Sequence, residues 1–289
     1  MPTAPALIRI LSLLACLIGP IAGPVAAQGN DQTRRPSHCI AIAEVLGLSY
    51  VQKASYGAPL PDDWTVRLSY IDHAMFMLET PGGLRAVTDY VGFIGPVPPP
   101  DVVTMNRAHI SHWDPTPDPG IAHVLPGWSD RVGKAADHHL DLGEMLVRSV
   151  STDIRSGFDT GISAVERNGN SIFVFEVGGL CIGHLGHLHH EPTARQYAAL
   201  GRLDVVMAPV DGGLTLDTAT MTRVLTRLRS SVVLPMHWFG EAALQRFLIG
   251  MQDNFAIERR DTNAIEVSLR NLPNRPTVVV LRPSYLTRP

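Results

Sequence analysis

The stretch Cys181-Ile182-Gly183-His184-Leu185-Gly186-His187-Leu188-His189-His190 places four imidazoles within seven residues, directly behind an apolar run. Residues 171–177 and 180–182 are β-branched and aromatic, and Gly178-Gly179 separates them, which predicts two strands joined by a turn. The histidines therefore begin where a strand ends. Loops that leave neighbouring strands of an open α/β fold converge on a shared crevice, so we expect a ligand site at this edge.

Two other strand-like runs also lead to histidines. Residues 101–105 precede His109 and His112, and residues 231–234 precede His237. Taken alone, each histidine could belong to a solvated polar loop. Neutral imidazole, however, is the commonest protein ligand for Zn²⁺ and similar ions. Three strand ends that each lead to histidine therefore favour a metal site.

The composition is that of an ordinary globular chain. The sequence has 289 residues, of which 45% are hydrophobic and 18% charged, so it can bury a large core as one large domain or two small ones. Its net charge of −3 at pH 7 argues against nucleic-acid binding driven by overall charge. We therefore expect no nucleic acid among its partners.

Residues 1–27 have the features of a secretory signal peptide. They carry one charge, Arg9, then an apolar stretch that two Gly-Pro pairs interrupt, and they end in Val25-Ala26-Ala27, which fits a signal-peptidase site. The apolar stretch is too short and too broken for a stable membrane span. We predict cleavage after this site, loss of one positive charge to give a net charge of −4, and export to the periplasm or the medium.

The mature chain is expected to consist of an N-terminal extension at residues 28–63 and one domain at residues 64–289. The extension is loose by composition, with several prolines and one short apolar stretch. Export would place Cys39 and Cys181 in an oxidising compartment, where disulfides form. Cys181 lies in a predicted buried strand, so a disulfide with Cys39 is allowed but not favoured.

From residue 64 the pattern changes to a series of strands, and clear helices are predicted only after His190. Arg167-Asn168-Gly169-Asn170 carries the Asn-Gly signal of a tight hairpin. Helices are predicted at 193–200 and 217–229, and strands at 65–70, 74–79, 84–88, 101–105, 145–150, 161–167, 171–177, 180–182, 204–210, 231–234, 264–269 and 277–281.

Several short motifs follow one another in a recognisable order. They are Tyr70-Ile71-Asp72-His73-Ala74, Phe76-Met77-Leu78-Glu79, Val87-Thr88-Asp89, Asp101-Val102-Val103-Thr104, His184-Leu185-Gly186, Asp204-Val205-Val206 and Val233-Leu234-Pro235-Met236-His237. In this order, residues 64–238 resemble the metallo-β-lactamase fold, in the branch that contains ascorbate-phosphate lactonases and N-acyl-phosphatidylethanolamine phospholipase D. The resemblance implies an α/β fold, a four-layer αββα sandwich with two sheets packed face to face and helices outside.

The chain departs from that family at the metal motif. The family's His-x-His-x-Asp-His signature falls on Arg107-Ala108-His109-Ile110-Ser111-His112, so arginine replaces the first histidine and serine replaces the aspartate. His187 occupies the position of the family's bridging aspartate. The residue-wise match assigns His109 and His184 to ligands of the first metal, and His112 and His237 to ligands of the second.

The lost carboxylates predict one metal ion rather than two. Two dications held close together repel strongly unless an anionic bridge lies between them, whereas here every candidate ligand is a neutral imidazole and Arg107 adds positive charge. We expect one ion, with Zn²⁺ favoured, and an open position at which a bound water becomes hydroxide near neutral pH. Its ligands would be three or four of His109, His112, His184, His187 and His237.

Three charged residues are candidates for catalytic roles beside this ion. Asp89 and Asp211 each follow an apolar strand and could act as a general base, although Asp211 could equally be the first residue of an Asp-Gly turn. The guanidinium of Arg107 could clamp a carboxylate or phosphate, or stabilise an oxyanion. His73 follows a strand of the first hairpin and could support a metal ligand from behind, although a buried, hydrogen-bonded histidine is the favoured interpretation.

The sequence therefore predicts an exported metal-dependent hydrolase of a small molecule, which cleaves an ester, lactone or phosphodiester bond by a metal-bound hydroxide in an all-histidine site. The alternative is a degenerate family member that binds a metal or small ligand without turnover. The sequence does not predict the oligomeric state.

Overall fold

The computed structural model describes residues 1, 34–40, 55–106, 110–131, 134–156 and 164–288. The chain divides into two units, Met1–Arg34 and Arg35–Pro289. Met1 and Arg34 are the two residues of the first unit that the structure describes. Most of the predicted signal peptide at 1–27 therefore lies outside the described residues. Every helix and strand described below belongs to the second unit.

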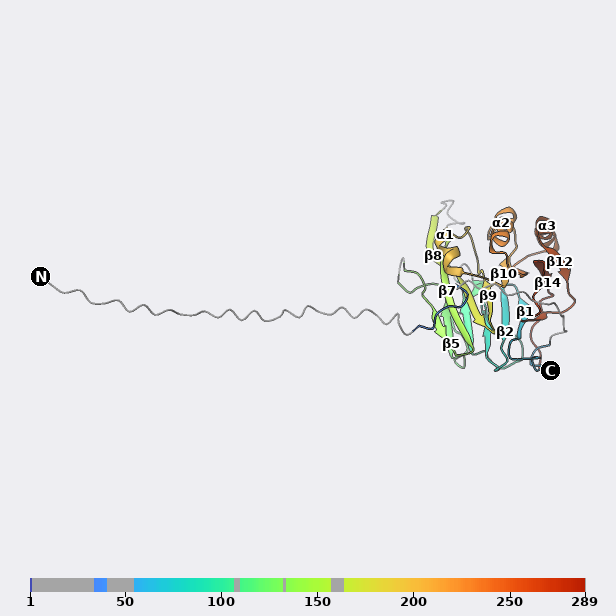
Figure 1. The fold of residues 1–289 in the computed structure, drawn as a ribbon, viewed down its shortest axis with the longest axis horizontal. Helices are drawn as coiled ribbons and strands as arrows, with labels where there is room; N and C mark the ends of the chain where they lie inside the picture. Colours follow the sequence, from blue (N-terminus) through green and yellow to red (C-terminus); the bar gives the residue numbers. More distant parts are fainter. Residues whose placement is uncertain (2–33, 41–54, 107–109, 132–133, 157–163, 289) are drawn as a thin grey trace. The chain divides into compact units, whose positions relative to one another are not determined.

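The second unit is built on two β-sheets (Figure 1). The six-stranded sheet has the order β13 (Ala264–Val267), β1 (Val66–Asp72), β2 (Met75–Glu79), β3 (Arg85–Val87), β4 (Val102–Met105) and β5 (His123–Pro126). The eight-stranded sheet has the order β12 (Ala256–Arg259), β14 (Thr277–Val280), β11 (Val232–Met236), β10 (Val205–Pro209), β9 (Leu180–His184), β8 (Ala164–Val177), β7 (Met145–Ser156) and β6 (His139–Asp141).

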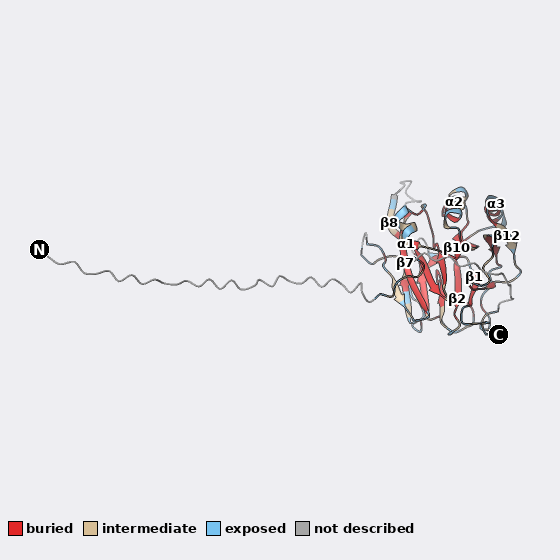
Figure 2. Cartoon of the chain, viewed as in Figure 1, coloured by how far each residue is buried: buried red, intermediate tan, exposed pale blue. Residues whose placement is uncertain are grey.

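The two sheets pack face to face across an apolar core. Phe76 from β2 belongs to the same buried cluster as Phe173 and Phe175 from β8. Successive strand residues point to opposite faces, so Val205 of β10 faces this core while Val206 packs on the outer side of the sheet. Because both faces of β10 are covered, its sequence is an almost continuous apolar run. Figure 2 shows the buried residues concentrated along the strands.

Three α-helices cover the outer face of the eight-stranded sheet in the described residues. They are α1 (Ala194–Leu200), α2 (Thr218–Leu228) and α3 (Glu241–Met251). The Asp217 carboxylate caps α2 by accepting from the backbone N–H of Thr220, as expected for an N-cap aspartate. Loop residues, among them Trp113 and Leu286, cover the outer face of the other sheet. The predicted α/β sandwich of two sheets is therefore confirmed. Among the residues that the structure describes, no helix has both the length and the apolar character that a membrane crossing requires.

The predicted hairpin at Asn168-Gly169 is wrong. β8 runs without a turn from Ala164 to Val177, and Arg167, Asn168 and Gly169 lie opposite Asp153 alone as a bulge in its pairing with β7. Asn168 has φ 57°, and its N–H donates to the Asp153 carboxylate at 2.9 Å. Asn-Gly favours positive φ, which suits a bulge as well as a hairpin turn.

The expectation about the cysteines must also be corrected, because Cys39 and Cys181 form a disulfide with their Cα atoms 5.8 Å apart. Cys181 is buried in β9, as predicted, but the segment at 35–40 lies against it. The Ser37 hydroxyl donates to Glu176 Oε1 at 2.5 Å, and the backbone N–H of Arg202 donates to Cys39 O at 2.8 Å. The disulfide therefore joins the start of this unit to a central strand.

We expect Cys39→Ser to lower the free energy of unfolding by about 2–5 kcal/mol, because the bond closes a long loop and restricts the unfolded chain. The two cysteines are 142 residues apart. Denaturant unfolding of the oxidised protein measures the effect. Ile40→Ser, at an exposed neighbouring position, is the control and should change little. An unchanged midpoint in Cys39→Ser would show that the crosslink does not contribute.

Candidate metal centre

The candidate site lies where strand ends from both sheets meet. β9, β10 and β11 are parallel neighbours, so their carboxyl ends bring His184, Asp211 and His237 to one edge of the eight-stranded sheet. In the six-stranded sheet, β3 and β4 are also parallel, and they lead to Asp89 and to the short 3₁₀ helix η2 (Ile110–His112). A contact between His112 and His237 links the two groups.

Asp89 holds the ring of His112. Its Oδ2 lies 2.6 Å from His112 Nδ1, and its Oδ1 accepts a 2.7 Å hydrogen bond from Asn106 Nδ2. Asn106 Oδ1 accepts from the backbone N–H of Ser171 at 2.9 Å, which ties this loop to the eight-stranded sheet. Asp89, Asn106 and His112 are all fully buried. A carboxylate can only accept, so His112 carries its proton on Nδ1 and a lone pair on Nε2.

Asp211 holds His237 in the same way. Its Oδ2 lies 3.0 Å from His237 Nδ1, and its Oδ1 accepts from the backbone N–H groups of Gly213, Leu214 and Thr215. Burial alone would raise the pKa of Asp211, but the hydrogen bonds from His237 and Thr215 outweigh it and hold that pKa well below its usual value. The carboxylate is therefore ionised at neutral pH, and His237 also presents a lone pair at Nε2.

These two lone pairs face each other, because His112 Nε2 and His237 Nε2 are 3.1 Å apart. Such a contact is repulsive unless a proton or a metal ion lies between the nitrogens. Tetrahedral zinc places two imidazole nitrogens about 3.3 Å apart, and a carboxylate behind each ligating histidine is the common supporting arrangement. The residues present therefore fit a divalent metal ion.

His73 completes a group of three histidines. One ring nitrogen from each of His73, His112 and His237 lies within 4.8 Å of the others. The rings of His73 and His237 are 4.1 Å apart, and the backbone N–H of His237 donates to His73 O at 2.8 Å. His73, Asp89 and His237 have φ values of 45°, 44° and 56°, which are uncommon for residues other than glycine. Backbone strain of this kind concentrates at functional sites.

His184 is buried beside the group, but hydrogen bonds occupy both of its ring nitrogens. Its Nε2 lies 2.8 Å from Ala74 O, and its Nδ1 accepts from the backbone N–H of Gly186 at 3.2 Å. Burial also lowers the pKa of His184, which favours the neutral ring. In this arrangement His184 has no lone pair directed at an ion.

His187 packs against the facing pair. Its ring is 4.9 Å from the ring of His112 and 4.8 Å from that of His237. Its Nδ1 contacts His189 Nε2 at 2.5 Å, and its backbone N–H donates to Asn170 Oδ1 at 2.8 Å. The structure therefore brings His112, His187 and His237 together, and places His184 at the edge of this cluster.

Two of the predicted site residues, Arg107 and His109, lie outside the described residues. The two predicted bases, Asp89 and Asp211, lie behind the histidines and bind their Nδ1 atoms. Sequence reasoning missed the place of His73 at the centre, although the stretch Tyr70-Ile71-Asp72-His73 carried the information that a histidine follows the first strand.

Sequence reasoning also missed the supporting partners Asn106 and His189. His189 was visible only as one of four clustered histidines, and nothing local indicated that the backbone N–H of Arg155 would bind its Nδ1 at 2.7 Å. The role of Asn106 depends on Ser171, which is distant in sequence, so no local pattern indicated that Asn106 would support the site.

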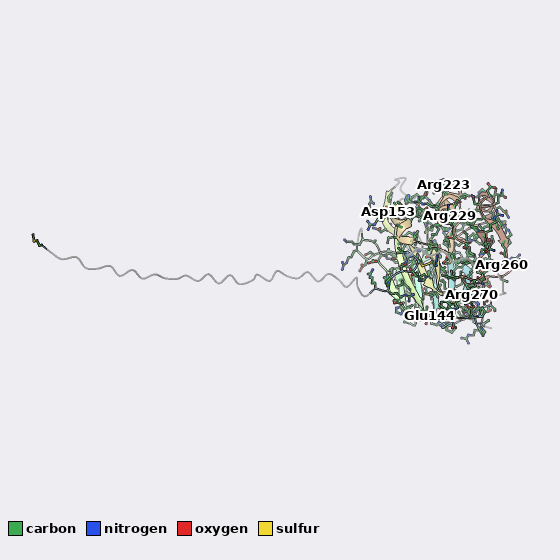
Figure 3. The ribbon with its side chains drawn as sticks, in the orientation of Figure 1. Glu144, Asp153, Arg223, Arg229, Arg260 and Arg270 are labelled. Atoms are coloured by element: carbon green, nitrogen blue, oxygen red, sulfur yellow. A yellow bond between two sulfur atoms is a disulfide. The ribbon has the colours of Figure 1, made fainter. Side chains whose placement is uncertain are left out.

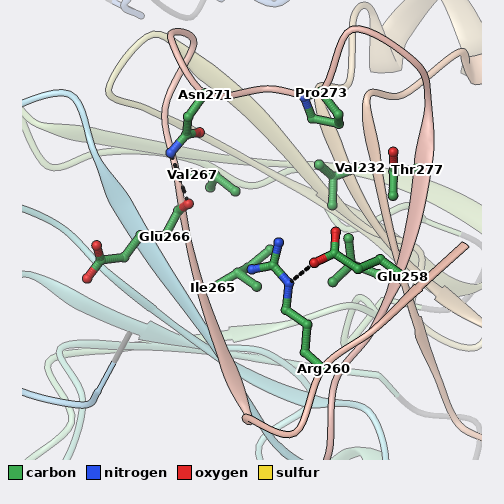
Figure 4. Close-up of a pocket in the computed structure, with 10 residues that line it drawn as sticks. Val232, Glu258, Arg260, Ile265, Glu266, Val267, Asn271, Pro273 and Thr277 are labelled. Carbon is green, nitrogen blue, oxygen red and sulfur yellow. Dashed lines mark hydrogen bonds and ion pairs between the residues drawn. The ribbon is translucent and has the colours of Figure 1, made fainter. Parts of the chain in front are cut away.

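Two hollows elsewhere in the unit are less suited to a substrate. Figure 4 shows one between the sheets, where Glu258 pairs with Arg260 at 2.7 Å; its volume is about 70 Å³. The other is a shallow depression beside α2, where Figure 3 labels Arg223 and Arg229. Arg223 lies 3.8 Å from Glu191, so this basic surface is partly balanced within the chain.

Comparison with known proteins identifies the family. The model of the beta-lactamase superfamily domain matches residues 67–237, which is more than half of the chain. The chain belongs to the beta-lactamase superfamily. It is 23% identical over 207 residues to a protein of Methanosphaerula palustris named a metal-dependent hydrolase, and the match covers 67% of this chain and 92% of that protein.

Two solved structures are similar to this chain in fold. A candidate Zn-dependent hydrolase of the metallo-beta-lactamase superfamily from Thermotoga maritima is 26% identical, with a TM-score of 0.51, and the match covers 75% of this chain and 98% of that one. A candidate metal-dependent hydrolase from Parabacteroides distasonis has the same TM-score at 14% identity, covering 65% of this chain and 89% of that one, and shows the fold alone.

Proposed function

We propose that this member of the beta-lactamase superfamily is an exported hydrolase that uses one divalent metal ion, with Zn²⁺ favoured. The observation that carries the proposal is the facing pair His112 Nε2 and His237 Nε2, 3.1 Å apart, each supported by a buried carboxylate. The names of the M. palustris and T. maritima relatives support metal-dependent hydrolysis.

His112 and His237 would hold the ion, with His73 in reach as a third ligand. His109 stays a proposed ligand on the strength of the family match. When bound, the ion would act as a Lewis acid and lower the pKa of a water molecule. Asp89 and Asp211 orient the ligands and increase their basicity, because each accepts the Nδ1 proton of one histidine.

Arg107 stays proposed as the group that clamps a substrate carboxylate or phosphate, or stabilises an oxyanion. It stands two positions before His109 in the sequence, and a guanidinium suits planar, bidentate recognition of such anions. In this scheme the metal activates water and Arg107 binds the charged end of the substrate.

Exposed apolar side chains border the site and support a substrate with an apolar group. Ile110, Leu214 and Phe239 are 73%, 49% and 65% exposed. The Phe239 ring lies 5.2 Å from the ring of His237. Ile110 begins η2, which ends in His112, and the backbone N–H of Leu214 donates to Asp211 Oδ1 at 2.6 Å. We therefore propose a small-molecule ester, lactone or phosphodiester, in keeping with the proposed branch of ascorbate-phosphate lactonases and N-acyl-phosphatidylethanolamine phospholipase D.

Activity measured with and without metal tests the proposal. The protein would be purified from the cell envelope, its first residue determined, its metal measured by elemental analysis, and its hydrolysis of 4-nitrophenyl esters, lactones and bis(4-nitrophenyl) phosphate assayed. A mature chain that starts at Gln28, and turnover that chelation removes and Zn²⁺ restores, are expected. Bound metal without turnover of any compound would favour the alternative, a family member that binds without catalysis.

We expect Phe239→Ser to lower kcat/KM for a 4-nitrophenyl ester of a medium-length acid by roughly tenfold or more, because burial of an apolar side chain contributes about 1.5–3 kcal/mol. The acetyl ester should be affected much less. Ile249→Ser on α3, where Ile249 is 62% exposed, serves as the control. Equal losses for both esters would contradict an apolar contact with the substrate.

A further inference from the structure

A chain of hydrogen bonds after β9 fixes the protonation of His189. The backbone N–H of Arg155 donates to His189 Nδ1 at 2.7 Å. A backbone N–H can only donate, so His189 Nδ1 must carry a lone pair. The single proton of this imidazole therefore lies on Nε2, which is 2.5 Å from His187 Nδ1.

The same reasoning fixes the protonation of His187. Its Nδ1 accepts the proton of His189 Nε2, so the proton of a neutral His187 lies on Nε2. Nδ1 has used its lone pair on His189, and an Nε2–H cannot bind a metal. The ring is 3% exposed, and the backbone N–H of His187 donates to Asn170 Oδ1 at 2.8 Å. The tautomer and the position of the ring are thus both held.

We infer that His187 is not a metal ligand but a hydrogen-bond donor to the substrate, and that His189 is the positioning residue that sets its tautomer. The donor role rests on the proposed hydrolytic function, whereas the tautomer follows from the hydrogen bonds alone. His187 matches the position at which the family has a metal-bridging aspartate. In this chain that position therefore holds an N–H donor.

The location of His187 suits that role. Its ring is 4.9 Å from the ring of His112 and 4.8 Å from that of His237, so the ring belongs to the same buried cluster as the proposed metal ligands. When water attacks an ester, lactone or phosphodiester, negative charge develops on an oxygen of the substrate. A fixed donor in a water-poor site stabilises that charge, and its proton stays on His187 throughout.

The tautomer can be measured directly by ¹⁵N NMR of the histidine rings in the full mature protein. His187 would be assigned from the signals that disappear in His187→Gln or His187→Asn. We expect protonated Nε2 and unprotonated Nδ1, both in metal-free protein and after one equivalent of Zn²⁺. Loss of the Nε2 proton on addition of Zn²⁺, with the shift of a coordinated nitrogen, would overturn the inference. His189→Phe should release the fixed tautomer.

Matched variants separate a donor from a ligand. The side-chain amide of glutamine can place an N–H near the position of Nε2, whereas that of asparagine reaches only the position of Nδ1. Calorimetric titration with Zn²⁺ should give an unchanged stoichiometry for both His187→Gln and His187→Asn. Weakened Zn²⁺ binding in both would show that His187 is a ligand.

The same two variants test the donor role on whichever chromogenic substrate the wild-type protein hydrolyses. His187→Asn should lower kcat by roughly 10²–10³-fold, which is the effect of losing one oxyanion donor. His187→Gln should keep most of the wild-type kcat. Equal activity of both variants with wild type would refute the donor role. If no substrate is hydrolysed, the proposed function fails, and the NMR and Zn²⁺ measurements still decide the tautomer.

Discussion

Tight Zn²⁺ binding is expected to be lost when His112 and His237 are both replaced by asparagine. The two Nε2 atoms face each other at 3.1 Å and form the centre of the proposed coordination shell. Asparagine keeps a donor near the position of Nδ1, so Asp89 and Asp211 retain a hydrogen-bond partner and the buried carboxylates are not left uncompensated. The substitution therefore removes the ligand atoms while it preserves the support behind them.

Calorimetry with metal-free protein measures this loss, and circular dichroism checks that the double variant is folded. His123→Asn is the matched control, because His123 pairs with Val102 at the start of β4, at the opposite end of that strand from the site. The control should bind Zn²⁺ as the unmodified protein does. Stoichiometric binding of undiminished affinity in the folded double variant would rule out this pair as the metal centre.

The fold could be predicted because local patterns agreed with the tertiary structure. The run at 204–210 is apolar throughout because both faces of β10 are covered, and Gly178-Gly179 forms the turn between β8 and β9 with φ values of 58° and 76°. The short strands β5, β6 and β12 were missed. Their residues are mostly half-buried or exposed, so no strong alternation marked them.

Features that depend on distant partners could not be predicted. Cys39 lies in a segment of loose composition, and no local pattern shows that it pairs with Cys181, which is 142 residues away in the sequence. At the site, the sequence showed which histidines follow strands but not which nitrogen each one uses. His184 Nε2 binds Ala74 O, from the other sheet, at 2.8 Å, and only the structure reveals this contact.

The number of metal ions is the second large effect that we expect. Unmodified protein should bind one Zn²⁺ per chain, because two dications about 4 Å apart repel by roughly 17 kcal/mol at an effective dielectric constant of 20. No carboxylate occupies the bridging position, where His187 instead contacts His189. Arg107 adds one more positive charge near that position in the family match. These charges disfavour a second ion.

Restoring the family pattern should raise the capacity to two Zn²⁺. Arg107→His, Ser111→Asp and His187→Asp together supply one neutral and two anionic ligands and remove one cation, so the repulsion between the ions is offset. Calorimetric titration of metal-free protein gives the stoichiometry. The control carries similar charge changes at three other positions, Arg270→His, Ser129→Asp and His123→Asp, and should still bind one ion.

His187→Asp alone should fall short of two, because it supplies one anionic ligand but leaves Arg107 and Ser111 in place. Two tight sites in the unmodified chain would refute the single-metal centre, regardless of the result for the triple variant.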